Sequence, residues 1–447
     1  MKQIRLKPGC RYLRLGAALL SLTMTACSFW SALPSADEQA VKLAETLEQG
    51  AYKSINRYSV ESRREVWQHG QSELDVVLTS PTEHGNYPLI IYLPGLGESA
   101  EAGKVWQEHW AQAGYVVFSL QAVEAAKALQ ALETKFSEDD ETENEPALRA
   151  DEIDRELPEA DERLKRAEDL HQRRSPTARN SELRYLGREY FSDSNLERRL
   201  AHLYWAYQQF KNRAAARQAP YVSADLSKVI LAGYELGAQT VAAASGETFT
   251  IRRPENNGLE PAAVIVLSPA VDLATGNTRA RFQALKPPML VITGTRDNDP
   301  YAISSAAART GIWEHAPAGN KLLLLLQDAG HRLLAGSESG GRFGRENARE
   351  RMGGIFSSDT GWDGRSSGRS GSRRSSADSS FMSRGVIDAP FDRERPRPDL
   401  GYKHVAAVLS VSTAFLDLQS KHDEFAKSWL GDRANLWLGK AGSLKTK

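Results

Sequence analysis

The chain has 447 residues, of which 57 are Lys or Arg and 57 are Asp or Glu, so its formal net charge at pH 7 is zero. This balance argues against a nucleic-acid partner held by bulk electrostatics. Apolar residues make up 41% of the chain, an ordinary fraction for a globular protein. The length is enough for one large domain or two small ones.

Residues 1–26 are predicted to be a lipoprotein signal peptide. A basic start is followed by an apolar run over 15–26 that is too short to span a bilayer. The run ends in Met24-Thr25-Ala26-Cys27, which resembles a bacterial lipobox. This resemblance implies lipidation of Cys27, and Ser28 after it resembles sorting to the outer membrane, so we expect an envelope protein that faces the periplasm. The alternative interpretation is an ordinary secretory signal with a chance cysteine.

The cysteine count agrees with a lipid anchor. Cys10 and Cys27 are the two cysteines of the chain. The first would leave with the signal peptide and the second would be acylated, so no thiol would remain for a disulfide, a nucleophile or a metal site. The sequence also has no metal-spaced histidine cluster and no phosphate-cradling glycine loop, and we expect no cofactor and no metal.

The rest of the chain is predicted to form one α/β domain with two interruptions. Strand, helix and strand over 87–120 imply a parallel sheet. The stretch 123–184 is dense in charged residues and is expected to be lid-like or disordered, with little packing. The stretch 336–386 is rich in Gly, Ser and Arg and is expected to be disordered. The remaining parts are an anchor, tether and N-terminal helix over 27–60, globular parts over 61–122 and 185–335, and closing helices over 387–447.

One stretch of the second globular part combines a strand, a sharp turn and a helix. The apolar run over 229–232 is typical of a buried parallel strand, and Gly233-Tyr234-Glu235-Leu236-Gly237 then reverses the chain. Small residues over 238–244 suit a tightly packed helix. Glycine is needed on both sides of the turn because strand and helix approach closely there, and the central residue takes a strained conformation.

This arrangement resembles the nucleophile elbow of the α/β-hydrolase family, in particular its dienelactone-hydrolase and lipase-like members. The family pattern is Gly-x-Ser-x-Gly, and Glu235 stands here in place of the serine. The resemblance runs from Leu74 to Leu430 with the two interruptions. It implies the α/β-hydrolase fold, a mostly parallel central sheet flanked by helices.

Three further segments match the family in its chain order. Leu93-Pro94-Gly95-Leu96-Gly97 lies where the family has its oxyanion loop, and the resemblance implies oxyanion donors at the N–H groups of Leu96 and Leu236. The family acid falls on Asp297, with Asp299 as the runner-up. The family general base falls on His331, which follows a glycine after the last strong strand. The implied constellation is therefore Glu235, Asp297 and His331.

Glu235 leaves two functions open. As a nucleophile it would resemble the aspartate of haloalkane dehalogenases and epoxide hydrolases, in a hydrolase that acts on an ester-like or alkyl small molecule. Alternatively, the elbow survives as architecture, Glu235 forms an ion pair with His331 and raises the histidine pKa, and the protein binds a ligand or an envelope partner without catalysis. A hydrolase with another nucleophile is the third possibility.

The lipobox resemblance gives the first testable prediction. Expressed in a Gram-negative host, the protein should incorporate labelled palmitate and stay with the membranes, because several acyl chains each contribute about 0.8 kcal/mol per buried CH₂. The Cys27→Ser variant should lose both the label and the membrane association. A wild-type chain that is cleaved after its signal but carries no label would contradict the anchor.

Overall fold

The computed structural model describes residues 36–141, 176–250, 252–271, 277–336 and 398–447. The predicted signal peptide, the lipidation residue Cys27, the middle of the charged insertion and nearly all of the Gly/Ser/Arg-rich stretch lie outside these residues. The predictions made for those segments therefore stay predictions.

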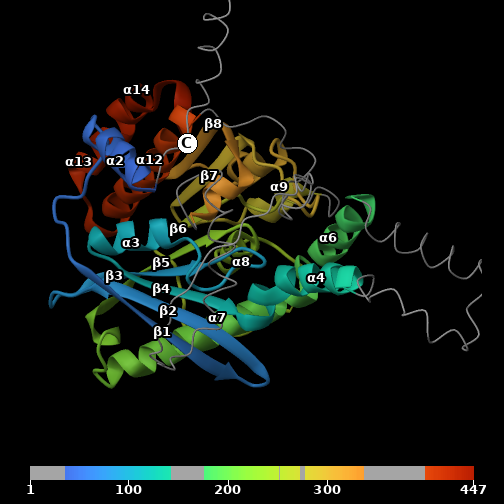
Figure 1. Cartoon of the computed structure of the whole chain (residues 1–447). Helices are drawn as coiled ribbons and strands as arrows, with labels where there is room; N and C mark the ends of the chain where they lie inside the picture. Colours follow the sequence, from blue (N-terminus) through green and yellow to red (C-terminus); the bar gives the residue numbers. More distant parts are fainter. Residues whose placement is uncertain (1–35, 142–175, 251, 272–276, 337–397) are drawn as a thin grey trace, which may run out of the picture.

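Within the described residues, nine strands form one mixed sheet in the order β1-β2-β4-β3-β5-β6-β7-β8-β9 (Figure 1). The pairings from β4 to β8 are parallel, and β1, β2 and β9 join by antiparallel pairings at the two edges. The predicted α/β class with a mostly parallel sheet is confirmed. The strands are β1 (Val60–His69), β2 (Ser72–Pro81), β3 (Tyr87–Leu93), β4 (Val116–Ala122), β5 (Ala224–Tyr234), β6 (Ala263–Leu267), β7 (Met289–Arg296), β8 (Lys321–Gly330) and β9 (Gly442–Thr446).

Helices precede, connect and follow these strands, and among the described residues none is both long and apolar enough to cross a membrane. The α-helices are α2 (Ala36–Glu48), α3 (Lys104–Gln112), α4 (Val123–Glu141), α6 (Pro176–Tyr190), α7 (Asp193–Ala215), α8 (Leu236–Ala244), α9 (Thr278–Phe282), α10 (Gly311–His315), α12 (Pro398–Leu416), α13 (Glu424–Ser428) and α14 (Ala434–Leu438). Short 3₁₀ turns are η1 (Tyr221–Ser223), η3 (Ala308–Thr310), η4 (His331–Ala335) and η7 (Gly439–Ala441), and π-helical turns are η5 (Asp417–Lys421) and η6 (Trp429–Arg433).

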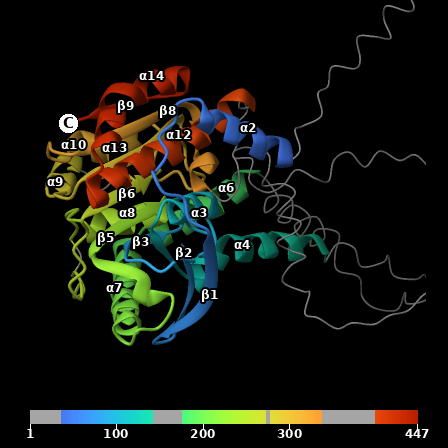
Figure 2. The same ribbon diagram turned by 90° about the vertical axis from the view of Figure 1, so that its left-hand side faces the viewer.

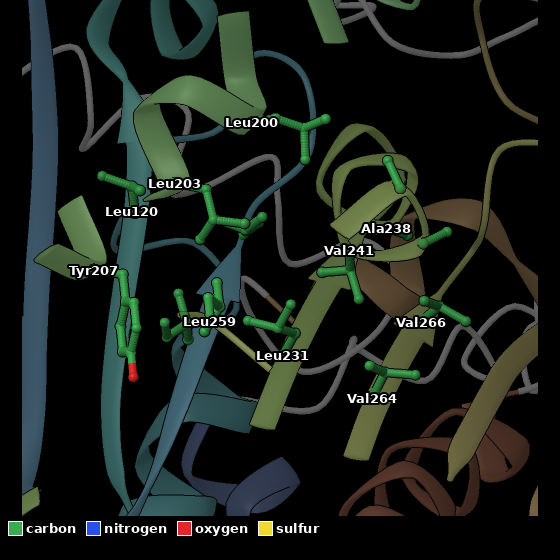
Figure 3. Packing of buried hydrophobic residues seen from close by; sticks show 14 of the residues in the cluster. Leu120, Leu200, Leu203, Tyr207, Leu231, Ala238, Val241, Leu259, Val264 and Val266 are labelled. Atoms are coloured by element: carbon green, nitrogen blue, oxygen red, sulfur yellow. The ribbon is translucent and has the colours of Figure 1, made fainter. Parts of the chain in front are cut away.

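The central strands are buried on both faces and send alternate side chains to opposite sides, whereas the edge strand β1 is largely exposed. Leu231 of β5 packs in one core with Leu203 of α7 and Val241 of α8, as Figure 3 shows. Its neighbour Ile230 belongs to a second core, which includes residues of α3, α12 and α14. In Figure 2, α7 and the group formed by α12, α13 and α14 lie on opposite sides of the sheet.

Both ends of the charged insertion are helical and packed, which differs from the expectation of a solvated segment. Ala125 and Ala128 of α4 are buried in the core that contains α7 and α8. Leu183 and Leu186 of α6 pack against the same core. These few apolar residues are spaced three or four apart within a charged sequence, so overall composition hides the apolar stripe that buries them. The C-terminal part also differs, because it ends in the edge strand β9 in addition to the expected helices.

The approach of α8 to β3 is the tightest backbone contact at the predicted elbow. A Cβ placed on Gly237 would lie 1.9 Å from the carbonyl oxygen of Leu93, and one on Gly233 would lie 2.6 Å from the backbone of Gly237. Glycine is therefore required at both positions by contact with backbone, which cannot move aside as a side chain could.

Gly237→Ala should consequently destabilise the protein severely. We expect a loss of about 3 kcal/mol or more in the free energy of unfolding, because overpacking against backbone forces β3 and α8 apart. Gly431→Ala is the matched control, since a Cβ there meets no atom within 4 Å. Chemical denaturation of both variants measures the difference, and equal stabilities would mean that the elbow relaxes easily.

Candidate active site

Glu235 sits at the turn between β5 and α8 in a strained backbone conformation. Its φ and ψ angles are 50° and −104°, and the residue is 2% exposed. Its N–H donates to the carbonyl of Leu267 at 2.9 Å. Such a conformation costs about 1–3 kcal/mol and persists where the surrounding structure over-determines it. Here the close packing at Gly233 and Gly237 does so.

The Glu235 carboxylate turns back towards the loop after β3. Its Oε2 accepts the N–H of Leu96 at 2.8 Å, and the side chain makes no capping hydrogen bond to α8. Gly95 approaches so closely that a Cβ on it would lie 2.9 Å from Oε2. Leu96 itself is 3% exposed. The N–H of Leu96, which the sequence predicted as an oxyanion donor, therefore donates its hydrogen bond to the Glu235 carboxylate.

The second predicted donor, Leu236, is the first residue of α8 and is buried. Amides in the first turn of a helix lack an intrahelical acceptor, so the N–H of Leu236 is available in principle to an anion at the elbow. The positive end of the α8 dipole also favours a carboxylate at position 235.

His331 lies between the two predicted acids. It begins η4, directly after β8, and its Nδ1 is 2.7 Å from Oδ1 of Asp297. Its Nε2 is 3.4 Å from Oε1 of Glu235. The hydroxyl of Tyr234 donates to the His331 carbonyl at 3.1 Å, which ties the histidine to the elbow strand. The structure thus brings the three predicted residues together.

Asp297 is fully buried at the end of β7. Its Oδ2 accepts the hydroxyls of Ser268 and Thr293, each at 2.7 Å. Its Oδ1 is hydrogen-bonded to Nδ1 of His331 and lies 3.1 Å from Nε of Arg309. Burial raises the pKa of Asp297, but Arg309 and the hydrogen bond with His331 outweigh burial and hold it well below its usual range. Asp297 is therefore a fixed anion beside the imidazole.

The runner-up acid, Asp299, has another role. Its carboxylate accepts the N–H groups of Tyr301, Ile303 and Ser304 at 2.8, 3.1 and 2.6 Å, respectively. These bonds shape the loop that follows β7. Its link to the other charged groups runs through Arg309, whose Nη2 lies 3.4 Å away. The structure therefore places Asp297, and not Asp299, against the histidine.

Arg309 is a central residue that the sequence did not reveal. Its side chain has no exposed surface. The guanidinium donates to the carbonyls of Asp297 at 2.7 Å, Ser268 at 2.7 Å and Pro269 at 2.9 Å. It thereby fixes the loops after β6 and β7 behind the imidazole. An arginine among small residues, twelve positions after the acid, carries no motif, so no sequence signal could have found it.

His331 is held as a cation at neutral pH. Burial lowers the pKa of the imidazole, but the hydrogen bonds to Asp297 and Glu235 raise it, and the net pKa is raised to about 9. A protonated imidazole donates from both nitrogens, which suits the two carboxylates that face it. It cannot accept a proton from a nucleophile or from water while it stays charged.

Neither metal-ligand groups nor comparisons with known proteins give further information about this site. In the described part of the chain, no group of three or more His, Cys, Asp or Glu side chains is placed to hold a metal ion. No family model matches the chain, and no curated protein matches its sequence. Function is therefore inferred from the geometry of the charged residues themselves.

The Glu235→Gln variant should lower the pKa of His331. The amide keeps the size of the side chain but removes one of the two charges that stabilise the imidazolium, while Asp297 remains. NMR titration of the His331 ring should show its pKa falling from about 9 towards the ordinary value of 6.5. Glu124→Gln, which removes an exposed carboxylate paired with Arg198, is the control and should leave the titration unchanged.

The same pKa predicts how stability depends on pH. Because the folded pKa of about 9 lies above the unfolded value near 6.5, protonation of His331 stabilises the fold fully below pH 6.5. This contribution, about 3 kcal/mol by linkage, should be lost as the pH rises from 6.5 to 9. Denaturation of wild type and His331→Gln at pH 6 and pH 9.5 measures it. A stability difference that does not shrink at the higher pH would contradict the assignment.

Proposed function

We propose that this protein is a non-catalytic member of the α/β-hydrolase superfamily, anchored in a bacterial envelope through Cys27, which binds a ligand or an envelope partner. The observation that carries the proposal is the position of the Glu235 carboxylate. Oε2 holds the N–H of Leu96 at 2.8 Å and Oε1 faces the cationic His331 at 3.4 Å. In a serine hydrolase these two groups would serve the substrate oxyanion and the nucleophile.

Three physical points support the loss of acyl transfer. A carboxylate that attacks an ester gives an anhydride, which is not a productive intermediate. The oxyanion donor at Leu96 is already engaged by a charged acceptor, and charge-assisted hydrogen bonds are about twice as strong as neutral ones. Removing one partner from a buried ion pair such as Glu235–His331 costs about 3–5 kcal/mol, so a substrate carbonyl would not displace the carboxylate readily.

The superfamily assignment is supported by the order and position of the site residues. The elbow follows β5, Asp297 follows β7, and His331 follows β8. All three strands belong to the parallel part of the sheet, so their carboxyl ends meet at one edge, where ligands of open α/β sheets bind. Glycine at positions 233 and 237 satisfies the packing that the elbow motif demands.

A second candidate is a hydrolase with Glu235 as a covalent nucleophile. The observation that favours it is that Leu96 binds only Oε2, while Oε1 has, among the described residues, only the long 3.4 Å contact with His331 and keeps a lone pair that could attack an alkyl carbon. The new C–O bond would form as a leaving group departs with its electron pair. The resulting neutral ester would remove one anion from His331, so the imidazole pKa would fall and His331 could take a proton from water. When water attacks the ester carbonyl, the N–H of Leu96 would donate a hydrogen bond to the oxyanion that forms on Oε2.

The Glu235→Ser variant tests the non-catalytic proposal. Serine frees the N–H of Leu96, restores a hydroxyl at the elbow and removes one anion from His331. We expect wild type to be inert towards p-nitrophenyl acetate and the serine variant to hydrolyse it at least tenfold faster than Glu235→Ala, in which the donor is equally free but no nucleophile exists. The activity should disappear when His331→Gln is added. Equal rates for the serine and alanine variants would show that the scaffold is not poised for acyl transfer.

Isotope labelling separates the two candidates. If wild-type protein turns over an alkyl halide or an epoxide in ¹⁸O-water, label should enter the Glu235 carboxylate, because water attacks the ester carbonyl. His331→Gln should then trap the ester as added mass on the peptide that contains Glu235. Label at Glu235 would overturn the non-catalytic proposal, and its absence with every substrate class would leave that proposal standing.

A further inference from the structure

A concave feature lies between β1 and the C-terminal end of α7, away from the elbow. It is a hollow of about 530 Å³ lined by Arg63, Glu65, Arg213, Gln218, Ala219 and Tyr221. This size is within the range of about 300–1,000 Å³ that small-molecule sites occupy. Strand β1 and helix α7 lie at the same end of the molecule in Figures 1 and 2.

Glu65, which lines this hollow, already has three partners. Its Oε1 lies 2.9 Å from Nε of Arg63 in an ion pair and accepts the hydroxyl of Tyr221 at 3.0 Å, and its Oε2 accepts the indole N–H of Trp67 at 2.8 Å. Residues 63, 65 and 67 alternate along β1 and so point to one face of the strand. Two of the three partners of Glu65 are neutral groups. Its single negative charge cannot balance the positive charges of both Arg63 and Arg213.

Arg213 has hydrogen-bonding capacity to spare. Its guanidinium carbon lies over the Trp67 ring, 4.0 Å from the ring centroid, and 5.5 Å from the centroid of Tyr221. Within the described residues it makes no hydrogen bond or ion pair, so stacking holds it in place while its N–H groups remain free. Arg63 uses Nε for Glu65 and keeps its two Nη groups. Two guanidinium groups against one carboxylate leave a net positive charge in the hollow, where stacking holds Arg213 and Arg63 is 61% exposed.

We propose that this hollow binds a phosphate monoester through Arg63 and Arg213. A guanidinium group can donate two parallel hydrogen bonds to two phosphate oxygens. A phosphate monoester dianion has three terminal oxygens and can bind two guanidinium groups at once, whereas a carboxylate has only two oxygens and one negative charge. Gln218 adds an amide at the rim. The phosphate can belong to a soluble metabolite or to a lipid headgroup, because both present the same monoester to the arginines. The site is independent of Glu235 and of whether the elbow catalyses a reaction.

Titration calorimetry on the full chain tests the proposal with inorganic phosphate and glycerol 3-phosphate. We expect binding that weakens at least tenfold in Arg63→Met and in Arg213→Met, because each variant removes one fork and keeps an apolar stem of similar length. Arg198→Met is the matched control, since it removes an exposed guanidinium of the same helix that pairs with Glu124, and binding should stay within twofold. Arg63 lies on an exposed edge strand, so its variant remains informative if Arg213→Met unfolds the protein.

Vesicle binding distinguishes the two sources of phosphate. Phosphatidic acid carries a monoester, whereas phosphatidylglycerol carries a diester of the same sign. A preference for phosphatidic acid that Arg63→Met abolishes would assign a lipid headgroup, and binding of glycerol 3-phosphate without that preference would assign a soluble ligand. Failure of every phosphate probe to bind below about 10 mM, or equal binding by wild type and both pocket variants, would overturn the proposal.

Discussion

The close approach of α8 to β3 determines most of what this molecule presents at the elbow. With a glycine at 237, the helix sits where a Cβ would be 1.9 Å from the Leu93 carbonyl. That contact holds the loop after β3 beside the start of α8. Glu235 is consequently forced into a strained turn with its carboxylate against the N–H of Leu96. The strain at position 235 is thus a consequence of packing, and any residue with a Cβ would bear it there.

Around this turn each buried charge is paired with a charge of opposite sign, although Arg309 also lies 3.4 Å from Nδ1 of His331. Arg309 contacts Asp297, Asp297 contacts His331, and His331 faces Glu235, so each charge has an opposite neighbour. Buried charges are tolerated when they are paired and hydrogen-bonded, and the backbone N–H of Leu96 completes the series at its far end. Asp299 adds a third carboxylate, 3.4 Å from Nη2 of Arg309, so the cluster holds more carboxylates than cations. Pairing within the cluster explains how a glutamate can be accommodated at this turn.

Hydrogen-bond pairing also distinguishes two arginines of this protein, Arg309 and Arg213. At Arg309, the guanidinium donates to backbone carbonyls and carboxylates, its Nη2 also lies 3.4 Å from Nδ1 of His331, and the side chain has no exposed surface, so its charge serves the fold. At Arg213, aromatic rings hold the guanidinium without using its N–H groups. An arginine positioned by stacking keeps its hydrogen-bonding capacity for a ligand. The difference lies in the partners of the two side chains, since both are arginines on packed elements.

The sequence by itself determined the strands other than β9, the turn at 233–237 and the position of His331 after β8, because apolar runs and glycine spacing are local signals that a mostly parallel sheet obeys. It could not choose between Asp297 and Asp299, which lie two residues apart, since that choice depends on which carboxylate the loop turns inward. It could not find Arg309, or the packing of α4 and α6, because their partners are distant in sequence. Only the tertiary structure decided that the Glu235 carboxylate accepts the N–H of Leu96. The sequence shows that residue 235 is negatively charged, and the fold decides which group binds that charge.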